Sequence, residues 1–198
     1  MQATTCLRDY IIMKLFYRPT AYQLLKAKNE IFVTRGVPAL EKNGFEKAPF
    51  PESLYGKNNL GDYTYEFCRL NMGSNLEMIT VHITKGDRWI QIFLNIFKLE
   101  PQLDSLSKLT AINGIQFRLN PNNRSKMRLR SDDFKGMPLF NTKEHQLKSF
   151  YTEKGFWKSV NDLGKLVESD MENINSSVTR WHELHKPMVT TWEGHGLI

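Results

Sequence analysis

The sequence predicts an α+β protein in which a curved antiparallel meander of about five strands packs against an N-terminal helix and a long C-terminal helix. Three observations lead to this prediction. Apolar residues recur every three or four positions near both ends of the chain, which is typical of amphipathic helices. Between them, apolar and polar residues alternate, which is typical of strands. Short turns rich in glycine and asparagine separate the alternating runs, so successive strands should pair antiparallel.

The first helix is expected from Ala21 to Arg35. Thr20 and Gln23 have the spacing of a capping box, in which each side chain accepts a hydrogen bond from the other residue's backbone. Gly36 and then Pro38 follow the last apolar residues, and we expect this pair to end the helix.

Three strands are predicted at residues 63–67, 76–84 and 88–99. The third strand has large apolar side chains on both faces, so we expect it to be central and covered on both sides. One face carries Ile90, Ile92, Leu94 and Ile96, and the other carries Trp89, Phe93 and Phe97.

Two further strands are predicted at residues 115–119 and 126–130, where the alternation resumes. Residues 141–154 should form a helix, with an asparagine as its N-cap and a glycine after its end. Apolar residues at spacings of three and four then run from Phe156 to Trp181, which predicts one long helix. Gly164 inside this helix should mark a close approach or a bend.

The 198-residue chain has the composition of an ordinary globular protein, with 40% hydrophobic and 24% charged residues. We expect one domain over residues 1–198. Residues 1–12 would be a disordered leader if Met13 were the true start, residues 37–61 a long loop, and residues 188–198 an irregular tail. The loop would act as a lid or a binding loop, unless it contains short strands.

The expected location is the cytoplasm. The longest apolar run is well short of the about 20 residues that a membrane-spanning helix needs, so no membrane partner is expected. The two cysteines, Cys6 and Cys68, lack the spacing of a metal or redox site and favour a reducing compartment.

Basic residues in the middle of the chain give the first functional hypothesis. The formal net charge is +6, and five cations gather in or beside the last two predicted strands: Arg118, Arg124, Lys126, Arg128 and Arg130. Like charges on one sheet face repel each other, so an anionic neighbour would be favoured. That neighbour would be an acidic protein or a nucleic acid. The alternatives are solvent or acidic residues of the last helix: Glu168, Asp170 and Glu172.

Aromatic residues of the strands give the second hypothesis. A small-molecule binding protein or enzyme would hold an apolar ligand between the sheet and the C-terminal helix. The residues expected to line this pocket are Tyr63, Tyr65, Trp89, Phe93 and Phe97. Ordinary core packing of the same rings is the alternative. A third hypothesis is a homo-oligomer formed through an uncovered sheet face.

No motif in the sequence points to catalysis. Phosphate-binding glycine loops and the nucleophile elbow are both missing. His182 and His185 share a helix face and could chelate a metal, but a solvated helix end explains them as well. His82 would serve as a base only if it opened into a cleft. We therefore predict a non-catalytic binding module with no catalytic residues, metal or cofactor.

Overall fold

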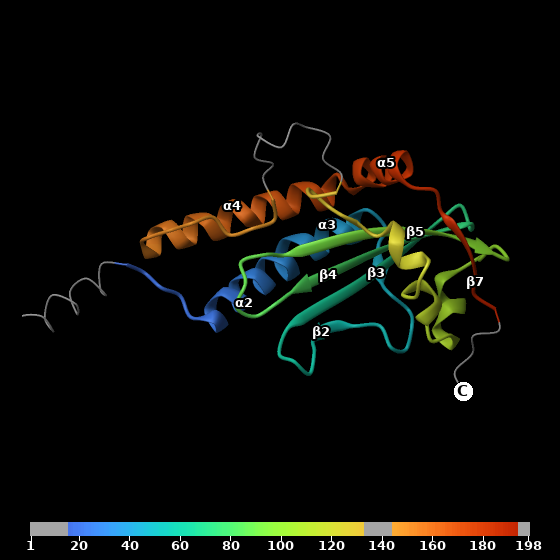
Figure 1. Cartoon of the computed structure of the whole chain (residues 1–198), viewed down its shortest axis with the longest axis horizontal. Coiled ribbons are helices and arrows are strands. Elements are labelled where there is room, and N and C mark those ends of the chain that lie inside the picture. The colour runs from blue at the N-terminus through green and yellow to red at the C-terminus, as the bar shows by residue number, and fades with distance from the viewer. Residues whose placement is uncertain (1–15, 133–143, 194–198) are drawn as a thin grey trace, which may run out of the picture.

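The computed structural model describes residues 16–132 and 144–193, and a seven-stranded sheet forms its centre. The long strands β3 (Tyr63–Asn71), β4 (Asn75–Ile83) and β5 (Gln91–Glu100) form the predicted antiparallel meander. The sheet is open, with helices from both ends of the chain beside it (Figure 1). The α+β architecture is therefore confirmed.

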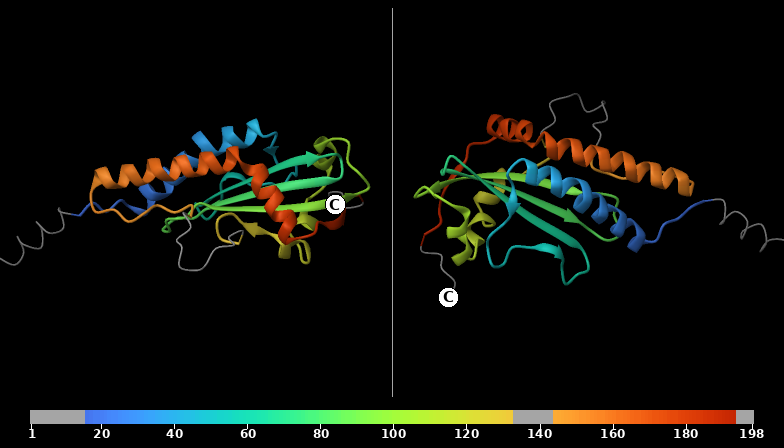
Figure 2. Two further views of the ribbon diagram at one scale, coloured as in Figure 1. Left: turned by 90° about the horizontal axis from the view of Figure 1, so that it is seen from above. Right: turned by 180° about the vertical axis from the view of Figure 1, so that it is seen from behind.

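The two sheet faces differ in what covers them. Phe67 lies opposite Ile79, and Ile79 lies opposite Leu94, so these side chains share one face, which packs under the helices. We call this the helix face. The alternate residues, including Phe93 and Phe97, lie on the other side, which we call the cleft face. In the view from behind in Figure 2, α4 lies above the strands and the yellow-green segment after β5 lies below them.

The N-terminal helix begins as predicted but does not end where predicted. Helix α2 (Ala21–Ile31) has the complete capping box of Thr20 and its partner. A π-helical turn, η1 (Phe32–Gly36), then leads directly into α3 (Val37–Lys42). Pro38 lies in the first turn of α3, where its missing N–H group is tolerated.

Gly36 allows a close approach instead of ending the helix. A Cβ atom at this position would lie 2.6 Å from Cδ2 of Phe32 and 3.2 Å from Cγ1 of Val167. A glycine followed by a proline is usually a stop signal, and here it marks the contact between two helices. The predicted end of the helix at this position is wrong.

The predicted loop at 37–61 is largely structured. After α3, two short strands, β1 (Glu46–Lys47) and β2 (Tyr55–Lys57), pair with different parts of β3. Phe45 and Phe50 are buried and anchor the segment. The alternative of short strands is thus correct. Residues 37–61 do not form one continuous loop, because α3, β1 and β2 lie within them.

The C-terminal helix begins later than the predicted one. Helix α4 (Glu153–Glu172) starts after Thr152, whose hydroxyl accepts a hydrogen bond from the Gly155 N–H group at 3.0 Å. Gly155 therefore lies in the first turn and ends no helix. The predicted helix at 141–154 is wrong for residues 144–150, which form no helix, and its expected cap lies outside the described residues.

The apolar positions of the long helix are buried as predicted: Phe156, Leu163, Val167, Met171, Ile174 and Trp181. The helix breaks once, at Asn173, and continues as α5 (Ile174–Leu184). A Cβ atom at Gly164 would lie 3.0 Å from the Arg35 guanidinium, so the predicted close approach is confirmed. No helix in the described ranges combines the length and the apolarity needed to cross a membrane.

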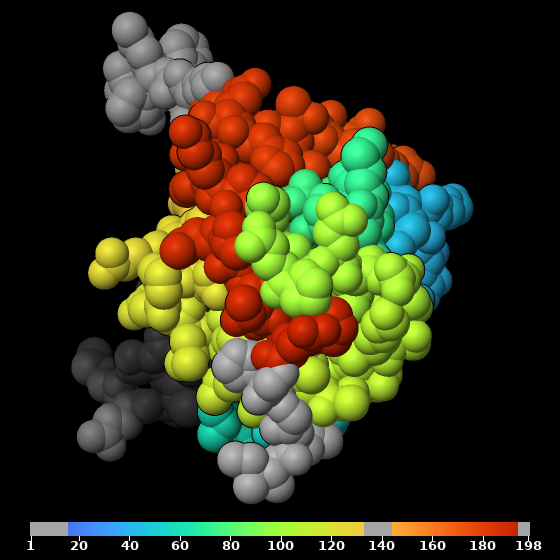
Figure 3. All heavy atoms as spheres, turned by 90° about the vertical axis from the view of Figure 1, so that its right-hand side faces the viewer, coloured from blue at the N-terminus to red at the C-terminus, as the bar shows by residue number. Residues whose placement is uncertain are grey.

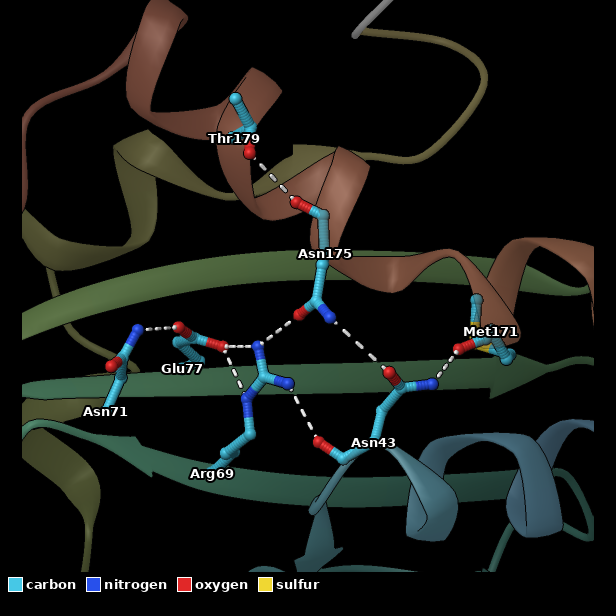
Figure 4. A network of polar contacts seen from close by, with 7 residues as sticks. All are labelled: Asn43, Arg69, Asn71, Glu77, Met171, Asn175 and Thr179. Carbon is cyan, nitrogen blue, oxygen red and sulfur yellow. Dashed lines mark hydrogen bonds and ion pairs between the residues drawn. The ribbon is translucent and has the colours of Figure 1, made fainter.

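An ion pair fixes the junction between α3, α5 and the sheet (Figure 4). Glu77 is fully buried and accepts hydrogen bonds from Arg69, from Nε at 2.9 Å and from Nη2 at 2.5 Å. The same guanidinium donates to the Asn43 carbonyl at 2.7 Å and to Oδ1 of Asn175 at 2.8 Å. Because a buried carboxylate needs such partners, this network holds the two helices against β3 and β4.

The chain after β5 departs from the predicted meander. It forms the 3₁₀ turns η2 (Leu106–Ala111), η3 (Ile115–Phe117) and η4 (Asn122–Ser125), then β6 (Met127–Arg128), which pairs with β5. The strand predicted at 115–119 is therefore wrong, and that at 126–130 is reduced to two residues.

Local packing explains this departure. Gly114 adopts a left-handed conformation (φ 69°) against the ring of Phe50, which turns the chain. Phe117 then packs between Phe50 and Phe97, with ring centroids 5.2 and 5.1 Å away. The Asn122 side chain donates a hydrogen bond to the Gln116 carbonyl at 2.7 Å, which links η4 to η3. A short apolar alternation does not by itself distinguish these turns from a strand.

The tail predicted to be irregular contains a strand. Residues Met188–Thr191 form β7, which pairs parallel with the end of β5. Trp192 extends this contact, because its Nε1 donates to the Pro101 carbonyl at 2.7 Å. In Figure 3 this red segment lies between the yellow-green and yellow parts of the chain that follow β5.

Candidate functional site

The cleft face is covered over only part of its area. Near β7, the turns after β5 bury Phe97 in a second hydrophobic core. Farther along the strands, a cleft of about 280 Å³ stays open between the sheet and the chain around η3 and η4. The residues that give it its chemical character are Glu66, His82, Phe93, Phe97, Arg118 and Lys126.

The floor of the cleft follows from strand register. Glu66 lies opposite Thr80, Thr80 opposite Phe93, and Phe93 opposite Arg128. Directly opposed residues of an antiparallel sheet project from the same face. One row across four strands therefore places a carboxylate, a hydroxyl, an aromatic ring and a guanidinium side by side.

Arg118 and Glu66 form an ion pair at one wall. Nη2 of Arg118 lies 2.6 Å from Oε2 of Glu66, which also accepts the Leu54 N–H group at 2.9 Å. The Glu66 side chain is 5% exposed and that of Arg118 is 33% exposed. The carboxylate is thus partnered within the protein, while part of the guanidinium faces the cleft.

The Lys126 ammonium has no carboxylate as an ion-pair partner in the part of the chain that the structure describes. Its Nζ atom lies 4.5 Å from the centroid of the Phe93 ring, a cation–π contact. Within the described residues, the ammonium forms no hydrogen bond or ion pair. Burial lowers the pKa of Lys126, against the opposing effect of the nearby Glu66 carboxylate. The Lys126 side chain is half-buried and lines the cleft, so its amine is available to a ligand.

His82 lies beside the same ring. The imidazole and Phe93 have centroids 5.8 Å apart, and Nδ1 lies 3.5 Å from Oγ1 of Thr64. Burial lowers the pKa of His82, and the positive charge of Lys126 lowers it further, while Glu66 acts in the opposite direction. At neutral pH the ring is therefore neutral and can both donate and accept a hydrogen bond.

Two more predicted basic residues lie next to the cleft. The Arg128 guanidinium lies 4.8 Å from the Trp89 ring, a second cation–π pair alongside that of Lys126 and Phe93. Arg124 is exposed in η4. One ring, Phe93, comes from β5, and the other, Trp89, lies two residues before that strand. One cation, Arg128, comes from β6, and the other, Lys126, directly precedes it.

Arg130 belongs to a different part of the molecule. Its backbone has a positive φ of 62°, which turns the side chain away from β6 and toward α4. There Nη2 lies 2.6 Å from Oδ1 of Asp170, and Nε2 of His145 lies 2.7 Å from Oδ2. Burial alone would raise the pKa of Asp170, but hydrogen bonds from Arg130 and His145 outweigh it and lower the pKa. For Arg130 the internal alternative, an acid of the last helix, is correct, so Arg130 does not share a sheet face with the other predicted cations.

The predicted aromatic residues divide between the two faces. Tyr63 and Tyr65 lie on the helix face, where the Tyr65 hydroxyl donates to Oδ1 of Asn29 at 2.6 Å. Burial raises the pKa of Tyr65 to about 12. The C-terminal helix covers this face, so the expected place of the pocket, beneath that helix, is wrong. The apolar residues of the C-terminal helix share one hydrophobic core with Ile92 and Leu94, and the rings of β5 lie on the other face of the sheet.

No protein-family model matches this chain, and no curated protein or solved structure is significantly similar to it.

Sequence reasoning found four of the six residues that characterise the cleft, but assigned them to two separate sites. It missed Glu66, and it considered His82 only as a base that would act if it opened into a cleft, which this ring does line. The alternation in β3 and β4 already puts both on one face, and only the register shows that this face is that of Phe93. In the described ranges no group of three or more His, Cys, Asp or Glu side chains is placed to hold a metal ion.

Proposed function

We propose that the protein is a non-catalytic binding module that holds a small organic anion with an apolar or ring portion in this cleft. The observation that carries the proposal is the Lys126 ammonium, which lies over Phe93 in a concave surface and lacks a carboxylate partner. Since a half-buried cation is costly without a counter-charge, an anion is the ligand that the cleft would favour.

The cleft supplies both parts of such a recognition site. Lys126 and the accessible part of Arg118 would bind the anionic group, and the ring of Phe93 would contact the apolar part. Its volume of about 280 Å³ lies at the small end of ligand pockets, which favours a ligand about the size of one substituted ring.

Calorimetric titration with phenyl phosphate and phenylacetate tests this proposal. We expect both to bind, and inorganic phosphate and benzyl alcohol to bind more weakly, because each lacks one of the two parts. Lys126→Met should lower affinity about 10- to 100-fold, since a hydrogen bond to a charged group contributes about 1.5–3 kcal/mol.

The matched control is Lys108→Met, because Lys108 is exposed and already paired with Asp104 at 2.6 Å. This variant should bind like the unmodified protein. Equal affinity of the Lys126→Met variant and the unmodified protein would contradict the proposal.

A second candidate function is binding of single-stranded nucleic acid. The observation in its favour is the neighbouring pairs Lys126–Phe93 and Arg128–Trp89, because bases stack on rings while cations contact phosphates. Fluorescence anisotropy with a labelled oligothymidylate should show binding that weakens with salt. Trp89→Ala and Arg128→Ala should each reduce it. Equal competition by polyglutamate would instead indicate an acidic protein partner.

A further inference from the structure

We infer that the Lys126 amine forms an imine with a small anionic compound that carries an aldehyde or ketone group. This inference rests on the proposed anion binding and names a reactive class within it. Three features carry it: the position of the amine in an open cleft, its freedom from partners, and a second cation in the same cleft.

The surroundings of Lys126 differ from those of other lysines in the fold. Lys28 is also buried, but its Nζ atom is held by Asp87, at 2.5 Å from Oδ1, and by the Thr84 carbonyl at 2.8 Å. Lys108 is exposed and paired with Asp104. Lys126 faces a ring on one side and the cleft on the other, so its lone pair could reach a bound carbonyl group.

Imine formation needs the neutral amine, and the cleft shifts the protonation equilibrium of Lys126 toward that form. Burial lowers the pKa of Lys126, with Glu66 opposing and Arg118 adding to the effect. Each unit by which a pKa falls toward neutrality raises the fraction of neutral amine about tenfold. Lysines in apolar surroundings are activated in this way for carbonyl chemistry.

The reaction requires no other reactant. The Nζ lone pair adds to the carbonyl carbon, and a proton passes from nitrogen to the oxygen, giving a carbinolamine. The hydroxyl then takes up the second nitrogen proton and leaves as water while the C=N bond forms. One water, made of the carbonyl oxygen and the two protons of the amine, is the only product besides the imine. Nothing is oxidised or reduced.

Arg118 would position the ligand for this step. Its side chain lines the same cleft and is 33% exposed, so the guanidinium can bind a phosphate or carboxylate while the carbonyl group meets Lys126. A simple aldehyde without an anionic group would lack this second contact. We therefore expect selectivity for anionic carbonyl compounds over neutral ones.

Pyridoxal 5′-phosphate is a suitable probe, because it joins a ring, a phosphate and an aldehyde. After incubation with the full chain, borohydride reduces any imine to a stable secondary amine, and peptide mass spectrometry locates it. We expect labelling at Lys126 to exceed that at Lys108 by about tenfold or more. Neutral pyridoxal should label Lys126 less, and Arg118→Met should reduce labelling by the phosphate compound.

A non-reactive analogue separates this inference from the proposed function. In 4-pyridoxic acid 5′-phosphate a carboxylate replaces the aldehyde, so only non-covalent binding is measured. Binding of the analogue is measured on the unmodified protein. Lys126→Arg forms no imine and should lose the label, whereas Lys108→Arg should keep it. If the analogue binds while Lys126 is labelled no more than Lys108, the inference fails and the proposed function stands. If the analogue does not bind either, both fail.

Discussion

At the scale of single residues, the cleft depends on how one buried carboxylate is compensated. Glu66 is almost inaccessible to water, and Arg118 is its ion-pair partner. A buried charge that loses its partner destabilises a fold more than the intact pair stabilises it. Arg118 therefore has a structural role as well as a place in the proposed ligand site, and the two roles can be separated by mutation.

Arg118→Met should lower the free energy of unfolding by about 1–3 kcal/mol, because Glu66 then keeps a charge without its guanidinium. The double variant Arg118→Met, Glu66→Gln should be more stable than the single one, since the unpaired charge is gone. Urea denaturation of both variants and of Glu66→Gln alone completes the cycle. Strictly additive effects would show that the two side chains do not interact.

His82 predicts a pH dependence at the same site. Its pKa in the folded protein is lowered by burial and by Lys126, with Glu66 opposing. Below the ordinary histidine pKa of about 6.5, the unfolded chain therefore binds a proton that the folded protein takes up only at lower pH. The contribution of His82 to stability is complete above that value and is lost as the pH falls from about 6.5 through the folded-state pKa.

His82→Gln should thus lose less stability than the unmodified protein between pH 8 and pH 5. Chemical denaturation at several pH values measures this difference. Parallel curves for the two proteins would contradict the lowered pKa.

At the scale of elements, two helical glycines differ in how easily the side chain next to them could move to make room for a Cβ atom. At Gly36 a Cβ atom would meet the ring of Phe32 at 2.6 Å, and at Gly164 it would meet the flexible guanidinium of Arg35 at 3.0 Å. A ring packed in a core cannot yield as an arginine side chain can. The two positions look alike in the sequence but should respond differently to alanine.

Gly36→Ala should destabilise the fold by about 1–3 kcal/mol, because a core ring must move. Gly164→Ala should range from neutral to about 1 kcal/mol more stable, since alanine favours helix over glycine by that amount. Thermal and urea unfolding of both variants gives the comparison. A stabilised Gly36→Ala variant would show that the Phe32 ring can shift without cost.

The same elements show where sequence patterns succeed. The capping box at Thr20, the three strands of the meander and the buried positions of the long helix were all predictable, because each depends on local spacing. The end of the first helix was not, since the contact of Gly36 with Val167 is made by residues far apart in the chain. Likewise, Phe50 and Gly114 decide the turn at η3, and neither lies in the misassigned segment.

At the scale of the whole molecule, the candidate site results from unequal covering of the sheet. Helices cover one face, while the turns after β5 cover only part of the other. Alternation predicted which side chains share a face of β5, so Phe93 and Phe97 were correctly grouped. It could not predict which layer covers that face. For this reason Tyr63 and Tyr65 were wrongly placed in the same pocket as these rings, and the basic residues were assigned to a separate site.

Each long edge of the meander is occupied by two short strands. On the β3 side these are β1 and β2, and on the β5 side they are β6 and β7. Unpaired edge strands are the usual starting points for uncontrolled association between chains, because their backbone groups can template a further strand. These four short pairings therefore oppose fibril-like growth of this sheet in either direction.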